Sequence, residues 1–83
     1  NTHYAVLCDR DDPEAVERAH EASGRIIDEA IELGGTCTGE HGIGVGKRSY
    51  LQMEYDSTAI ETMRSIKETV DPNGILNPGK IFE

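Results

Sequence analysis

The sequence has no tryptophan, one phenylalanine and two cysteines among its 83 residues. Two cysteines are too few for the disulfide framework that stabilises many small secreted domains, and Cys8 and Cys37 are too far apart for a Cys-x-x-Cys redox motif. We therefore predict that both thiols are reduced and half-buried. The sequence also lacks an apolar run approaching the ~20 residues that a transmembrane helix needs, so we expect no membrane span.

Basic residues are scarce as well. The chain carries 16 Asp and Glu residues against 8 Lys and Arg residues, which gives a net charge of −8. Binding to a phosphate backbone requires clusters of Lys and Arg, so this balance argues against a nucleic-acid partner. We expect a cytoplasmic location. The length suits one small domain, and because the first residue is not Met we expect the chain to be a piece of a longer protein.

The pattern of the first half predicts a strand followed by a long helix. Residues 3–8 are rich in β-forming side chains, and residues 9–13 form a polar turn. Asp12 can cap the helix and Pro13 suits its first position. Apolar and small residues then recur at spacings of three and four, which predicts one buried face: Val16, Ala19, Ser23, Ile26, Ile27, Ala30 and Ile31. Gly34 is placed to end this helix.

The second half predicts shorter elements. Residues 36–38 are β-branched at both ends and favour a short strand, while residues 47–53 can form a short helix. A further amphipathic helix should begin near residues 56–58, all of which can serve as an N-cap, and should end at the turn residues 71–74. Residues 75–82 are apolar and rich in turn formers, so we expect this tail to dock on a domain that is absent from this chain.

Glycines surround an acidic residue and a histidine in residues 39–46. Part of this run resembles two phosphate-binding motifs, but Lys47 stands where the dinucleotide fingerprint needs glycine. Arg48 stands where a phosphate-binding loop needs Ser or Thr. The adjacent Glu40 and His41 leave three interpretations open. Both can face a substrate, with His41 as a general base; Glu40 can bind a metal while His41 transfers a proton; or the pair can be structural.

His3 is a second candidate ligand. If the predicted strands of residues 3–8 and 36–38 are neighbours in one sheet, the long helix is their crossover, and His3 comes near Glu40. A histidine and a carboxylate from two strands would make half of a zinc or manganese site. An exposed histidine with no ligand role remains the alternative.

Two segments of the chain, GGTCTGEHGIGVGKRSYL and DPNGILNPGKIF, resemble the C-terminal end of FAD-linked oxidases and dehydrogenases of the vanillyl-alcohol oxidase type. The similarity is strongest to the glycolate oxidase large subunit and D-lactate dehydrogenase group. The opening residues, Asn1, Thr2 and His3, resemble the end of the family's GDGN-x-H segment. The resemblance runs from one end of the chain to the other.

This resemblance implies an α+β fold, namely part of a ferredoxin-like cap domain in which two short strands flank a long helix, followed by helices and a tail. Residues 1–83 would then be the C-terminal portion of the cap, and the FAD-binding domain would be absent. The resemblance also implies oxidation of a D-2-hydroxy acid, of the glycolate or D-lactate type, to the 2-keto acid with hydride transfer to FAD. The fragment itself should be inactive.

The site residues follow from the same resemblance. His41 matches the family's catalytic histidine, and Glu40 and His3 match ligands of a divalent metal such as zinc in metal-containing relatives. Asn77 matches a tail residue near the flavin. The implied partners are the protein's own FAD-binding domain, a small 2-hydroxy acid and electron-transfer subunits. Two alternatives remain: a non-catalytic α/β interaction module, and a flavoenzyme resembling alkyl-glycerone-phosphate synthase.

Overall fold

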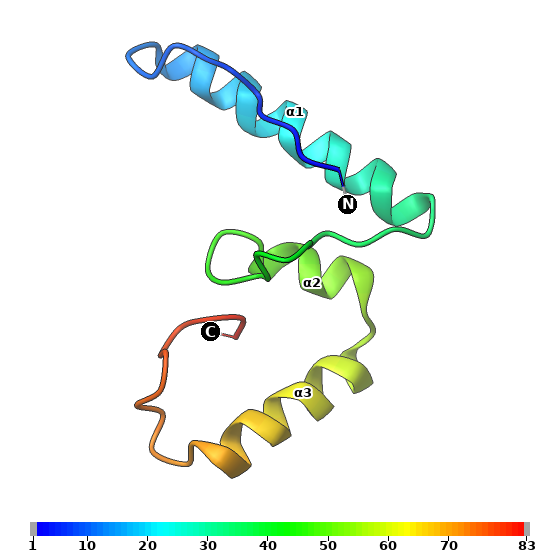
Figure 1. Cartoon of the computed structure of the whole chain (residues 1–83), viewed down its shortest axis with the longest axis vertical. Coiled ribbons are helices and arrows are strands. Elements are labelled where there is room, and N and C mark those ends of the chain that lie inside the picture. Colours follow the sequence, from blue (N-terminus) through cyan, green and yellow to red (C-terminus); the bar gives the residue numbers. More distant parts are fainter. Residues whose placement is uncertain (1, 83) are drawn as a thin grey trace. The chain divides into compact units, whose positions relative to one another are not determined.

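The structure, a computed structural model, describes residues 2–82. This part of the chain forms three helices, α1 (Pro13–Glu32), α2 (Arg48–Glu54) and α3 (Ser57–Val70), which are labelled in Figure 1. The chain divides into two compact units, Asn1–Thr36 and Cys37–Glu83. The first unit therefore contains α1, and the second contains α2, α3 and the tail.

Helix α1 begins where the sequence predicts it. Asp12 has an extended backbone, and its side chain accepts a hydrogen bond of 3.0 Å from the backbone N–H of Glu14. Pro13 takes the first helical position, where its missing N–H costs nothing. Ile27 is buried, whereas Ile26, which we placed on the same face, is 42% exposed. The predicted apolar face is thus only partly covered.

Two glycines end α1. Gly34 has a φ of +82°, a backbone conformation that favours glycine, and its N–H donates to the carbonyl of Ile31. The N–H of Gly35 donates to the carbonyl of Ala30 at 2.7 Å, and a Cβ at this position would lie 2.7 Å from that oxygen. A side chain at residue 35 would therefore break the helix end.

The two predicted strands do not form. Residues 3–8 and 36–38 have no strand pairing, and within residues 2–82 the structure is helical or irregular. Residues 2–11 are exposed and run beside α1 (Figure 1), where the hydroxyl groups of Tyr4 and Ser23 lie 3.3 Å apart. A strand needs a neighbour to satisfy its backbone groups, and this segment has none in its own unit. Cys8, predicted to be half-buried, is exposed accordingly.

The second unit begins its long helix at one of the three predicted caps. The side chain of Asp56 accepts a hydrogen bond of 2.8 Å from the N–H of Ala59, so Asp56 is the N-cap of α3. The short helix α2 contacts α3 and buries Leu51. Cys37 is also buried, more completely than predicted.

The tail is tied to the end of α3 through one carboxylate. Asp71 is buried and accepts hydrogen bonds from the backbone N–H groups of Ile75 (3.1 Å) and Leu76 (3.0 Å). It also accepts from the ammonium of Lys67, which donates in addition to the carbonyl of Leu76 at 2.6 Å. These contacts turn the chain sharply after Val70 and start the tail on its return path.

Apolar residues of the tail and of α3 remain exposed. Ile66, Val70 and Ile75 each leave more than half of their surface open, and Leu76 does so too. Such a concentration of exposed apolar residues at one end of a small unit is typical of a surface that another part of a protein covers. Across residues 2–82, no helix combines the length and hydropathy needed to cross a bilayer.

Candidate functional site

The glycine-rich loop, residues 39–46, leads from the buried Cys37 into α2. Gly42 and Gly44 have φ values of +71° and +58°, in the left-handed region. A Cβ added at either residue would meet nothing within 4 Å. The backbone conformation, rather than crowding, therefore requires glycine here, and the space beside both glycines is open.

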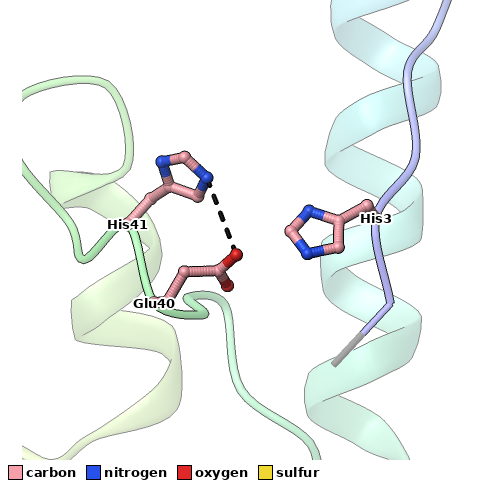
Figure 2. A group of neighbouring side chains, drawn as sticks. All are labelled: His3, Glu40 and His41. Carbon is pink, nitrogen blue, oxygen red and sulfur yellow. Dashed lines mark ion pairs between the residues drawn. The ribbon is translucent and has the colours of Figure 1, made fainter.

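Glu40 and His41 project from this loop. Figure 2 shows the two side chains turned toward one another, with 3.8 Å between Nε2 of His41 and Oε1 of Glu40. The side chains are 83% (His41) and 54% (Glu40) exposed. The separation exceeds a hydrogen bond, so the pair attracts when the imidazole carries a proton. The arrangement can therefore receive a proton on His41 while a carboxylate stabilises the resulting charge.

The beginning of the loop is anchored to the end of α2. The backbone N–H of Cys37 donates to Oε2 of Glu54 at 2.8 Å, and both residues are largely shielded from solvent. The pKa of the Cys37 thiol is raised to about 11, mainly by burial and to a smaller extent by a hydrogen bond to Glu54 and the charge of that carboxylate. The same carboxylate raises the pKa of Tyr55. Cys37 is therefore a protonated, structural thiol rather than a nucleophile.

The end of the loop is anchored to the tail. Arg48, the first residue of α2, donates from Nε to the carbonyl of Val45 (3.2 Å) and from Nη1 to the carbonyl of Gly79 (3.1 Å). The backbone N–H of Ile81 donates to the carbonyl of Gly44 at 2.7 Å. The loop that carries Glu40 and His41 and the tail that carries Asn77 are thus parts of one hydrogen-bonded arrangement.

Asn77 lies in the tail with a positive φ of +47°. It lines a groove of about 490 Å³ between α3 and the tail, together with mainly apolar side chains. The apolar residues that line this groove are Met63, Ile66, Leu76, Ile81 and Phe82. The contacts that join the tail to the loop come from Gly79 and Ile81 rather than from Asn77. The predicted proximity of Asn77 to a flavin stays a prediction.

His3 belongs to the first unit, whereas Glu40 and His41 belong to the second. The structure therefore brings His41 and Glu40 together within one unit, and the predicted pairing of His3 with Glu40 stays a prediction. Asn1, the first residue of the resemblance to the GDGN-x-H segment, lies outside the described residues.

Sequence reasoning missed the residues that hold the site. Arg48 entered only as a mismatch to a phosphate-binding motif, and Asp71 only as a turn former. The spacing of Lys67 and Asp71 is the i, i+4 spacing of a helical ion pair and could have indicated their contact. No local signal links Arg48 to Gly79, because 31 positions separate them.

The chain matches known proteins over its whole length. A sequence model of the family described as "FAD linked oxidases, C-terminal domain" matches residues 1–81. The chain is 43% identical over all of its residues to a probable mitochondrial D-lactate dehydrogenase from Danio rerio. It is 44% identical over 99% of its length to the glycolate oxidase subunit GlcD from Bacillus subtilis. It is 42% identical, also over 99%, to mitochondrial D-lactate dehydrogenase (cytochrome) from Arabidopsis thaliana.

The chain spans only a small part of these curated relatives. It covers 17% of the Danio rerio and Bacillus subtilis proteins and 14% of the Arabidopsis thaliana protein. What the matches establish directly is therefore the kind of domain.

Proposed function

The chain belongs to the family of FAD-linked oxidase C-terminal domains, and on that premise we propose that it works as part of a longer flavoenzyme, hereafter the whole protein. This enzyme oxidises a D-2-hydroxy acid of the glycolate or D-lactate type to the 2-keto acid. The observation that carries the proposal is the exposed Glu40–His41 pair on a glycine loop that is hydrogen-bonded to the tail. The names of the similar proteins supply the substrate class.

In this proposal His41 is the general base. The hydroxyl proton of the substrate passes to an imidazole nitrogen of His41 while the Cα–H bond breaks and its electron pair leaves as hydride. When bound, FAD supplies the acceptor for that hydride. Glu40 stabilises the imidazolium that forms, because its carboxylate lies 3.8 Å from Nε2. Covering the loop with the flavin-binding domain would exclude water and strengthen this attraction.

The exposed apolar surfaces fit a missing partner domain. We propose that the tail and the groove beside α3 dock on the FAD-binding domain of the whole protein, since Ile75 and Leu76 are exposed here. We also propose that residues 3–8 and 36–38 become strands of a ferredoxin-like cap when strands from outside this chain pair with them. We also propose that electron-transfer subunits are partners of the whole protein and that it is located in the cytoplasm.

A divalent metal such as zinc is a further part of the proposal, with His3 and Glu40 as ligands. Imidazole nitrogen and carboxylate oxygen are donors that zinc accepts. Both residues are exposed in the structure. A bound cation would stabilise the deprotonated form of the substrate hydroxyl and so assist His41.

The test of the base is His41→Ala in the whole protein. We expect the rate of flavin reduction by the best 2-hydroxy acid to fall by about 10²–10⁴-fold, the usual contribution of a general base, while FAD remains bound. His20→Ala is the matched control, because His20 is an exposed histidine on α1. Flavin reduction at the wild-type rate in His41→Ala would remove His41 as the base.

The test of the metal is elemental analysis of the wild type, Glu40→Gln and His3→Gln. We expect one divalent ion per wild-type molecule and a clear loss in both variants. Equal metal in all three proteins, or none in any, would remove the ligand roles. Absence of flavin reduction by any 2-hydroxy acid in the wild type would favour the non-catalytic module or the synthase-like alternative.

A further inference from the structure

We propose that Arg48 is the positioning residue that holds the Glu40–His41 loop against the tail and so keeps His41 in its catalytic place. This inference rests on the proposed function, and it concerns a residue with no direct part in the chemistry. Arg48 is half-buried at the start of α2, immediately after the glycine-rich loop.

The guanidinium joins three segments. Arg48 lies in the first turn of α2, and its guanidinium donates from Nε to the carbonyl of Val45 in the loop and from Nη1 to the carbonyl of Gly79 in the tail. The two acceptors are backbone carbonyls, so they follow the path of the chain rather than the identity of any side chain. One arginine thus fixes the loop relative to the tail.

A backbone contact completes the arrangement. Gly44 directly precedes Val45, which is one of the two acceptors of Arg48. The carbonyl of Gly44 accepts a hydrogen bond of 2.7 Å from the backbone N–H of Ile81. This contact requires the tail to lie alongside the loop, which is the placement that the guanidinium enforces. Gly42 and Gly44 adopt φ values of +71° and +58°. Because glycine restricts the backbone so little, the loop would have many accessible conformations without these contacts.

Arginine suits this role better than lysine. Its guanidinium presents several donors in a rigid planar fork and stays charged at all ordinary pH values. Lysine presents one ammonium on a flexible stem, which cannot reproduce the two donor positions of the fork. Catalysis depends steeply on placement, because a shift of about 1 Å in a reacting group can cost about 100-fold in rate.

The experiment compares Arg48→Met and Arg48→Lys in the whole protein, loaded with FAD. We expect Arg48→Met to slow flavin reduction by about 10–100-fold and to leave the KM for the 2-hydroxy acid within about threefold, since the substrate keeps its own contacts. Arg48→Lys should recover part of the rate. FAD content and the thermal midpoint should match the wild type, because both acceptor carbonyls can turn to water.

Amide hydrogen exchange gives a readout that does not depend on activity. In Arg48→Met the Ile81 amide should exchange at least about tenfold faster than in the wild type, because its partner loop is released. Arg18→Met is the matched control. Arg18 is an exposed arginine on α1 that forms an exposed ion pair with Glu14 at 3.9 Å, and its loss should change neither quantity.

The outcomes separate the two proposals. If the wild type reduces its flavin and Arg48→Met does so at the same rate, the positioning role is wrong while the proposed function stands. Unchanged exchange at Ile81 also overturns the positioning role. If no 2-hydroxy acid reduces the wild-type flavin, the proposed function fails and the catalytic role of Arg48 fails with it.

Discussion

The glycine-rich loop (residues 39–46) and the tail (residues 75–82) with the turn before it (residues 71–74) are both built from turn-forming residues, yet each uses its carboxylate differently. Asp71 in the turn before the tail has a side chain that is 3% exposed and is bonded to Lys67 and to two backbone N–H groups. Glu40 in the loop is 54% exposed and faces a histidine. One carboxylate therefore organises the chain, and the other is accessible to solvent and ligands.

The pKa of Asp71 reflects its structural role. The hydrogen bond from Lys67 lowers this pKa, and the N–H groups of Leu76 and Ile75 lower it further, while burial acts in the opposite direction. Residue type alone does not distinguish a structural acid from a functional one. The distinction comes from burial, because the side chain of Asp71 is 3% exposed and that of Glu40 is 54% exposed.

The largest expected effect on the comparison comes from Asp71→Ala. The variant removes the buried acceptor for Ile75, Leu76 and Lys67, and partly buried donors that lose their acceptor are unfavourable. We expect the thermal midpoint to fall by several degrees and the amides of Ile75 and Leu76 to exchange more than about tenfold faster. Glu68→Ala is the control, since it removes the same charge from an exposed position of α3.

The same carboxylate predicts an acid dependence. Because folding lowers the pKa of Asp71, its contribution to stability is complete above the ordinary value for Asp. It is lost as the pH falls through the folded pKa. The loss of stability on acidification should therefore be smaller in Asp71→Asn than in the wild type. An identical acid profile in wild type and variant would contradict the structural role.

Gly44→Ala should have the next largest effect. A left-handed conformation costs a residue with a Cβ about 1–2 kcal/mol, and Gly44 has a φ of +58° with no crowding around it. Gly46→Ala is the matched control in the same loop, because its φ is not positive and a Cβ there would meet nothing within 4 Å. Chemical denaturation of both variants measures the difference, and equal stabilities would show that the loop does not need its left-handed turn.

Cys37 predicts a smaller, alkaline effect. Burial raises the pKa of its thiol from 9.0 to about 11. The protonated thiol therefore contributes stability that is complete below pH 9 and is lost as the pH rises toward 11. Iodoacetamide at pH 8 should modify the exposed Cys8 well before Cys37. Mass spectrometry of the two labelled peptides measures this order, and equal labelling would contradict the anchoring of the loop by Glu54.

The smallest expected change in stability comes from Glu40→Gln. Exposed ion pairs contribute little, so we expect a change in the free energy of unfolding within about 0.5 kcal/mol. A large loss of stability would make Glu40 a structural acid like Asp71. The comparison between the loop and the tail would then fail.

Local sequence patterns predicted much of the fold. The Asp12 cap, Pro13 and Gly34 set the ends of α1, and each acts through neighbours in the chain. The strands at residues 3–8 and 36–38 were predicted from β-propensity, and they are absent from the described structure because pairing needs partner segments that propensity cannot supply. The burial of Cys37 likewise depends on distant residues.

The candidate site divides in the same way. The sequence alone placed Glu40 and His41 in a glycine loop and identified the family of the domain, because these features depend on adjacent residues. The tertiary structure decided that Arg48 bridges Val45 and Gly79, and that Asp71 is a buried acceptor rather than a turn residue alone. Such contacts join segments as far as 31 positions apart, and they exist only because the chain after α3 returns to the loop.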